Sequence, residues 1–83
     1  MAGTYSLAPQ SIEQHILACP SSTRALGGGG GHRDYNLAAL DITVNYSGPD
    51  PADPERKWRV ILTNNANVGR AIRVYCNCAR IAP

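Results

Sequence analysis

The chain has 83 residues, of which 43% are hydrophobic and 17% are charged, and its formal net charge at pH 7 is +2. A chain of this length has a thin core, because it buries only about 60% of the surface that its unfolded form exposes. We therefore expect a single domain over residues 1–83, with a disulfide, a metal or a partner subunit adding to its stability. No apolar run approaches the roughly 20 residues of a membrane helix, so we expect no insertion into a membrane.

The charges are distributed unevenly along the chain. Residues 1–55 contain all six acidic residues and two arginines, which gives −4, whereas residues 56–83 contain six basic residues and no acid, which gives +6. Such asymmetry suits an acidic partner, a nucleic acid or head-to-tail assembly. It is equally explained if the two ends neutralise each other across adjacent strands.

Apolar residues alternate with a period of two, which is typical of strands, and no segment sustains a helical period. The first predicted strand is residues 11–19 (SIEQHILAC). Its even-numbered residues, from Ile12 to Ala18, share one face, and its odd-numbered residues, from Glu13 to Cys19, share the other. The proline and hydroxyl residues that follow (PSST) predict a turn.

A second extended segment begins at Arg24 and runs into five consecutive glycines, Gly27–Gly31. A flexible linker here would divide the chain into pieces too small to fold. Glycine within a strand more often marks a bulge, or a place where another group approaches the backbone closely. A phosphate-binding loop is excluded, because no Lys-Ser or Lys-Thr pair follows the glycines.

The third predicted strand is residues 40–46 (LDITVNY). One of its faces is apolar and contains Leu40, Ile42, Val44 and Tyr46. Residues 47–55 (SGPDPADPE) are predicted to form a loop, because this segment is rich in proline and acidic residues.

The last two predicted strands are residues 56–64 and 70–81, joined by a turn (NANVG) in which Gly69 is free to adopt a positive φ. Their inward-facing residues are Trp58, Val60 and Leu62 on the first, and Ile72, Val74, Cys76 and Cys78 on the second. Arg59 and Arg73 fall on outward positions, so a hairpin of these strands would carry a positive stripe. We assign partner binding to this region, through Arg59, Arg70, Arg73 and Tyr75.

Five short strands with turns between them predict an all-β fold, either a small antiparallel β-sandwich or a curled sheet of about five strands. The three cysteines constrain the fold further.

A Cys19–Cys78 bridge would close a loop of about 60 residues and contribute roughly 4 kcal/mol in the chain-entropy description. A Cys76–Cys78 bond is disfavoured, because side chains two apart on a strand point in parallel. One cysteine is then free, buried as a small apolar residue, or paired between chains.

The runs LAPQSIEQHILACPSSTRALGGGGG, WRVILTNN and RAIRVYCNCA resemble a small β-module of secreted, actinobacterial-type proteins. That module has a segment ending in Cys-Pro, a hydrophobic residue before three glycines, a tryptophan strand ending in Asn, and a closing Tyr-x-x-Cys-Ala. The resemblance places the paired cysteines on Cys19 and Cys78, the glycines on Gly27–Gly29 and the tryptophan on Trp58. Cys76 and the longer glycine run depart from the pattern, which leaves Cys76 as a free or intermolecular thiol. The resemblance carries no assigned catalytic activity and implies an extracellular module.

Catalytic and metal sites are weaker interpretations of the same residues. A Cys–His pair of Cys76 or Cys78 with His15 or His32 is disfavoured, because a nucleophile needs an accessible polar pocket and these cysteines lie on an apolar face. A zinc site of the three cysteines and one histidine has the right ligand count but lacks the usual knuckle spacing. We therefore expect no enzyme, cofactor or metal.

Trp58 is expected to be the main core anchor, packed where the glycines leave room for its indole, with a sugar-stacking platform as the alternative. Tyr35, Tyr46 and Tyr75 are better placed for outside contacts. The polar segments TNNANVGR and GHRDYN offer groups that bind sugar hydroxyls, although ordinary turns account for them too. A nucleic-acid surface is disfavoured by the low net charge and the expected disulfide.

We therefore expect a non-enzymatic structural or docking module that works outside the reducing cytoplasm and binds a protein partner or assembles with itself. The opening stretch MAGTYSLAPQ lacks the basic start and apolar run of a signal peptide. Export would then use a leader removed earlier, or a larger particle, as for a phage decoration or filament subunit. The alternative function is a carbohydrate-binding module that uses exposed tyrosines and Asn-rich loops.

Overall fold

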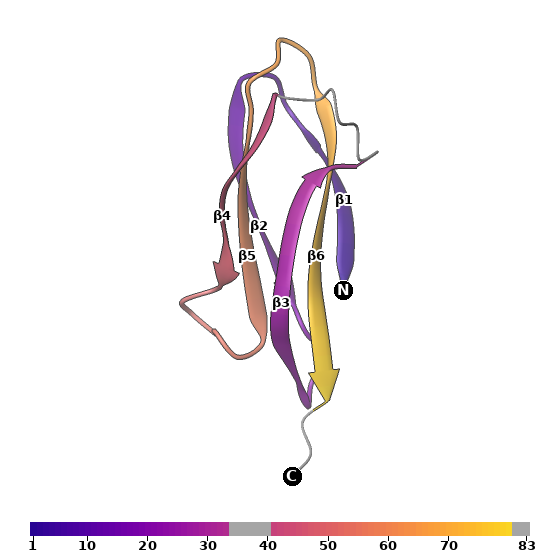
Figure 1. Ribbon diagram of the computed structural model, residues 1–83, viewed down its shortest axis with the longest axis vertical. Helices are drawn as coiled ribbons and strands as arrows, with labels where there is room; N and C mark the ends of the chain where they lie inside the picture. Colours follow the sequence, from indigo (N-terminus) through magenta and orange to yellow (C-terminus); the bar gives the residue numbers. More distant parts are fainter. Residues whose placement is uncertain (34–40, 81–83) are drawn as a thin grey trace.

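A computed structural model of the chain describes residues 1–33 and 41–80. These residues form six strands: β1 (Ala2–Leu7), β2 (Ser11–Ala18), β3 (Thr23–His32), β4 (Ile42–Pro49), β5 (Lys57–Asn64) and β6 (Arg70–Arg80). The strands form two antiparallel sheets, in the orders β1-β6-β3 and β2-β5-β4, which pack as an elongated sandwich of 49 × 23 × 15 Å (Figure 1). The predicted all-β antiparallel sandwich is confirmed, with six strands rather than about five. This part of the chain contains no helix that could cross a membrane.

The core lies between the two sheets. It consists of Leu7, Leu17, Cys19, Val60, Leu62, Ile72, Val74 and Cys76, with Ala25, Ile42, Trp58 and Cys78 packed against them. The alternation predicted for residues 56–64 and 70–81 is confirmed over the described residues, because Val60, Leu62, Ile72 and Val74 are each 0% exposed. Ile81, the last residue of the second predicted strand, lies outside the described residues. Each such side chain stabilises the fold by roughly 1.5–3 kcal/mol relative to an exposed one.

β1 was not predicted from the sequence. Of its six residues only Leu7 is buried, so the alternation within the segment is faint. β1 pairs along its whole length with β6, from Ala2 opposite Tyr75 to Leu7 opposite Arg70. Pairing with a distant strand, and not a local pattern, therefore makes this segment a strand.

The predicted alternation of β2 is correct, but the face with more isoleucine points outward. Leu17 and Cys19 are 7% and 1% exposed, whereas Ile12 and Ile16 are 65% and 42% exposed. A shift of one residue exchanges the two faces of a strand. The inward face is the one that brings Cys19 to Cys78 on the opposite sheet.

β4 begins later than predicted, at Ile42. It also ends later, because it includes Ser47, Gly48 and Pro49 from the predicted loop. Leu40, the first residue of the predicted strand, lies outside the described residues. A β-bulge between Val44 and Tyr46 places them opposite Leu62 and Ile61 respectively. The bulge therefore breaks the predicted apolar face, since consecutive residues of β5 point to opposite sides.

The last two strands do not pair as the hairpin that the sequence left possible, because β5 and β6 belong to different sheets. Asn64, at the end of β5 and 0% exposed, turns the chain toward the other sheet. Its side-chain Nδ2 donates to the backbone oxygens of Leu7, Ala8 and Val68 at 3.0–3.2 Å, and its Oδ1 accepts from the backbone N–H of Ala66 at 2.9 Å. Gly69 does not use a positive φ; none of the eight glycines does, and all of them lie in the described part.

The five consecutive glycines all belong to β3, which has a bulge between Ala25 and Gly27, as the sequence predicts. Gly28 lies beneath the indole of Trp58. A Cβ atom built on Gly28 would lie 2.6 Å from Cδ1 of Trp58 and 2.5 Å from the backbone oxygen of Tyr75. The indole Nε1 donates to Oγ of Ser47 at 3.0 Å. Trp58 therefore packs against the core across a glycine and is not an open sugar platform.

Candidate docking surface on the outer face of β6

The predicted basic stripe does not exist as one surface, because Arg59 and Arg73 lie on different sheets. Arg59 forms an ion pair at 2.8 Å with Asp50, a residue that is 2% exposed. Arg70 donates through Nε and Nη2 to one carboxylate oxygen of Asp41, at 3.1 and 2.9 Å. These two arginines hold the segments around β4 in place and are already paired within the fold.

Arg73 and Tyr75 are different, because both are exposed on the outer face of β6. Tyr75 is 44% exposed. Within the described part of the chain, the guanidinium of Arg73 forms neither a hydrogen bond nor an ion pair. Asn77 follows on the same face and is also exposed. We call Arg73, Tyr75 and Asn77 the β6 strip.

Small residues flank the β6 strip on both sides. Tyr75 lies opposite Ala2 of β1 and Gly29 of β3, and Arg73 lies opposite Thr4 and Gly31. A Cβ atom built on Gly29 would lie 2.9 Å from Oη and 3.1 Å from Cζ of Tyr75, so the ring rests over this glycine. The strip thus presents a cation, an aromatic ring and an amide between neighbouring strands that carry small side chains. Tyr and Arg, together with Trp, are the side chains most enriched at the energetic centres of protein interfaces.

The predicted disulfide joins Cys19, directly after β2, to Cys78 of β6, with Cα atoms 5.8 Å apart. It therefore links one sheet to the other. Cys76 is the remaining free cysteine and is 1% exposed. Burial raises the pKa of its thiol, an effect that the N-terminal ammonium group partly opposes. A buried, neutral thiol is a poor nucleophile and is badly placed to pair between chains.

The three sulfurs form one cluster. Sγ of Cys76 lies 3.5 Å from Sγ of Cys19 and 3.9 Å from Sγ of Cys78. No histidine or carboxylate of the described residues joins this group, and two of its members share the disulfide. His15 instead stacks on Tyr5, with ring centroids 4.0 Å apart. The structure does not assemble the Cys–His pair that the sequence left open.

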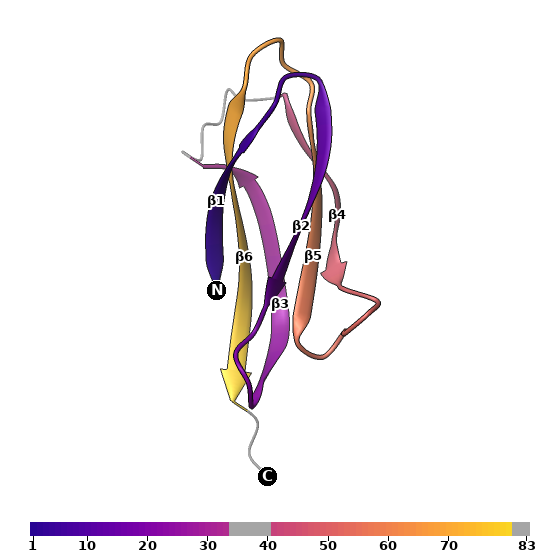
Figure 2. The ribbon, with the colours of Figure 1, turned by 180° about the vertical axis from the view of Figure 1, so that it is seen from behind.

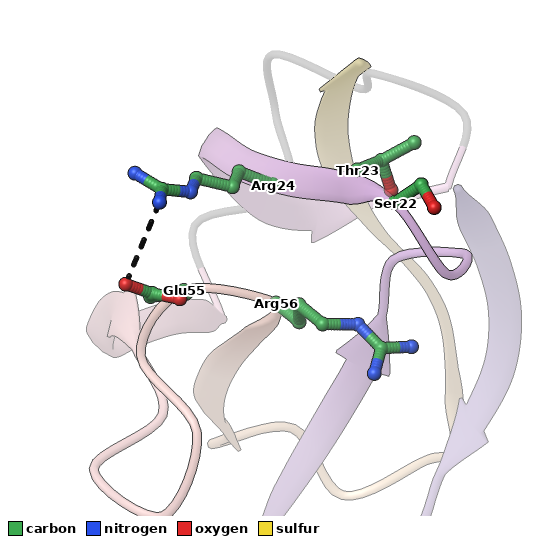
Figure 3. Close-up of a pocket in the computed structure, with 5 residues that line it drawn as sticks. All are labelled: Ser22, Thr23, Arg24, Glu55 and Arg56. Atoms are coloured by element: carbon green, nitrogen blue, oxygen red, sulfur yellow. Dashed lines mark ion pairs between the residues drawn. The ribbon is translucent and has the colours of Figure 1, made fainter. Parts of the chain in front are cut away.

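An open pocket of about 330 Å³ lies at the end of the sandwich where β3 begins (Figure 3). It is lined by Ser22, Thr23, Arg24, Glu55 and Arg56. Arg24 reaches Glu55 at 3.7 Å, while Arg56 donates to the backbone oxygen of Cys19 at 3.1 Å. Figure 3 shows the two guanidinium groups pointing in opposite directions. The pocket therefore offers no convergent charge to a ligand.

The predicted sugar-binding loops use their polar groups internally. The amide of Asn64 is fully engaged, and Oδ1 of Asn67 accepts from Nε2 of Gln10 at 3.1 Å. Tyr46 is 42% exposed and donates to the backbone oxygen of Pro49. Tyr35 and the rest of residues 34–36, which form the second half of the GHRDYN segment, lie outside the described residues.

Comparison of the chain with protein-family models, with curated protein sequences and with solved structures gave no match. Of the residues that the sequence assigned to partner binding, Arg73 and Tyr75 lie together on an open face, whereas Arg59 and Arg70 do not join them.

Proposed function

We propose that this protein is a non-enzymatic structural module that works outside the reducing cytoplasm, as a surface or particle subunit such as a phage decoration or filament protein. It docks to a partner protein through the β6 strip. The observation that carries the proposal is the exposed Arg73–Tyr75 pair, which has no partner for its cation among the described residues and is flanked by small residues. The disulfide between the sheets supports an oxidising compartment.

The chemistry of the strip indicates the kind of partner. A guanidinium group with no internal acceptor favours a carboxylate, which it can bind with two parallel hydrogen bonds. Gly31, which lies opposite Arg73 and has nothing within 4 Å of its virtual Cβ atom, lets a partner backbone approach the sheet closely. We therefore infer a partner that presents an acidic residue on a flat or extended segment.

A photo-crosslinking experiment tests this proposal. The residue p-benzoylphenylalanine replaces Tyr75 in one variant and Tyr46 in a matched control, since these tyrosines are 44% and 42% exposed and lie on different sheets. Irradiation in the producing cell or on the purified particle should give a heavier species at position 75 only, and adding R73E should remove it. Equal adducts at both positions, or none at position 75, would contradict docking through the β6 strip.

The alternative is a carbohydrate-binding module, and one observation favours it. Because the ring of Tyr75 rests over Gly29, its opposite face is open, and Arg73 and Asn77 flank it with groups that donate to hydroxyls. A glycan array should then show binding that Y75A removes and Y46A preserves. A silent array with the folded, disulfide-bonded protein counts against sugar recognition.

A further inference from the structure

The edge strands of this sandwich differ in how well they are protected against pairing with another chain. Proteins commonly protect an edge with a proline, a lysine, a bulge or a covering segment. β4 contains a bulge and ends at Pro49, and β3 contains a bulge and accepts a hydrogen bond at Gly28 from Ser47. β2 has none of these features over its eight residues, Ser11–Ala18. Its edge is therefore open to a further strand.

The open edge also exposes apolar side chains. β2 pairs with β5 on one side and with no strand of the described chain on the other. In Figure 2, β2 stands in the foreground of the sandwich. Ile12 and Ile16, both on its outer face, are 65% and 42% exposed. Two exposed β-branched side chains on a regular edge strand are typical of a surface that pairs.

The sequence of β2 is self-complementary around Gln14. Reading outward from Gln14, Glu13 and His15 come first and Ile12 and Ile16 come next. If two such strands pair antiparallel about a two-fold axis at Gln14, each isoleucine faces an isoleucine of the other copy and each Glu13 faces a His15. Opposite charges and apolar pairs directly across a ladder both stabilise a sheet.

His15 gives this register independent support. Its side chain is 14% exposed, and its buried Nε2 has no hydrogen-bond partner among the described residues, although Oε1 of Glu13 lies 3.3 Å away. A buried nitrogen without a hydrogen-bond partner is unfavourable, because it has given up its hydrogen bonds to water without replacing them. Stacking on Tyr5 holds the imidazole at this edge of the sandwich. A Glu13 carboxylate from a second copy would lie next to it.

We propose that β2 is the interface of a symmetric dimer, in which two copies of this chain pair their β2 strands antiparallel about Gln14. The two β2-β5-β4 sheets then become one continuous sheet. A two-fold axis at Glu13 would set the two Glu13 carboxylates against each other. An axis at His15 would set His15 against His15 and Glu13 against Leu17. Neither alternative is complementary, so the charges select the axis at Gln14.

This dimer does not depend on the docking function proposed above. The β6 strip lies on the outer face of the other sheet, so it stays open when β2 is paired. A dimer that does not dock would support the β2 interface and contradict the docking function, and a monomer that docks would do the reverse.

Charged pairs at Ile12 and Ile16 test the register. In the proposed dimer position 12 faces position 16 of the second copy, so I12K/I16K sets lysine against lysine, whereas I12K/I16E sets lysine against glutamate at both contacts. V44K is the matched control, because Val44 is 42% exposed, as Ile16 is, and lies on the opposite edge of the same sheet. Light scattering of the full chain at rising concentration measures the mass against the 8.9 kDa of one chain.

We expect wild type, V44K and I12K/I16E to reach twice the mass of one chain and I12K/I16K to remain at the mass of one chain. A wild type that stays monomeric, or two double variants that behave alike, would overturn the proposal. Circular dichroism and a retained Cys19–Cys78 bond show that each variant is folded. As a test that leaves the isoleucines intact, Q14C should form a disulfide-linked dimer on a non-reducing gel, and N45C on β4 should not; linkage of both or of neither would contradict the axis at Gln14.

Discussion

Replacing Gly28 by alanine is the substitution that tests the packing of this core most directly. Gly28 is where the Trp58 indole crosses β3, and the added methyl group would lie 2.6 Å from Cδ1 of Trp58 and 2.5 Å from the backbone oxygen of Tyr75. Carbon atoms in good contact are about 3.5–4.0 Å apart. The indole must therefore move, or β3 must retreat from β6. Gly31, in the same strand, has nothing within 4 Å of its virtual Cβ atom, which makes G31A the matched control.

The magnitude follows from two opposing effects. Inserting a methyl group into a packed site lowers the free energy of unfolding by about 1–3 kcal/mol. Replacing glycine by alanine also restricts the unfolded chain, which returns about 0.4–1 kcal/mol where the backbone tolerates it. G28A should therefore lose about 1–2 kcal/mol, whereas G31A should gain about 0.4–1 kcal/mol. For a domain of this size each kcal/mol shifts the Tm by about 4–8 °C.

Thermal and denaturant unfolding of both variants measure the difference. G28A should melt below wild type and G31A above it. In a W58F background the loss caused by G28A should shrink, because the smaller ring leaves space for the methyl group and neighbouring residues couple. If G28A and G31A change stability in the same direction and by similar amounts, Trp58 does not pack on Gly28 as described.

Four further predictions concern the cysteines and Asn64. C19A should lower the free energy of unfolding by about 4 kcal/mol in a denaturant titration, because it removes the bridge between the sheets. C78A should lower it less, because Sγ of Cys76 lies 3.5 Å from Sγ of Cys19 and can replace the lost partner; two free thiols in denatured, unreduced C78A would contradict this. N64A and N64D should each lose about 2–3 kcal/mol, since neither can donate to the Leu7 carbonyl, and unchanged melting would refute the role of this amide. Because burial raises the pKa of Cys76 above its ordinary 9.0, the folded state holds this proton more tightly than the unfolded state. The stability that this difference in pKa contributes is therefore complete below pH 9.0 and is lost as the pH rises through the folded pKa. The free energy of unfolding of wild type relative to C76A should fall above pH 9.0. Alkylation of the native protein at lower pH should leave Cys76 unmodified.

The strands that the sequence located best are those whose two faces differ. The buried residues alternate with half-buried ones in β5 and with exposed ones in β6, and the inward set was predicted correctly from Val60 to Val74. In a strand that lies between the core and the solvent, every second residue faces the core and is apolar, which is why the alternation in the sequence is a strong signal. β1 lacks the signal, because small and polar residues surround its one buried side chain, Leu7.

The candidate docking surface was only partly visible in the sequence. The outward positions of Arg73 and Tyr75 follow from the alternation of β6 and hold in the structure. The sequence could not show that Arg59 and Arg70 are already paired, because Asp50 and Asp41 come from other segments and meet them only in the folded chain. The same holds for Asn64, which looks like a loop residue and is 0% exposed.

By themselves, the residues of this chain determined an all-β body, the inward faces of its later strands and the need for glycine beside tryptophan. These are local properties, since they depend on alternation, backbone freedom and side-chain size. Which strands share a sheet was decided only by the tertiary structure. A hairpin of β5 with β6 and a crossing from one sheet to the other satisfy the same alternation. The buried amide of Asn64, the partner strand β1 and the covalent link from Cys19 to Cys78 select the crossing, and each acts between residues more than 50 positions apart.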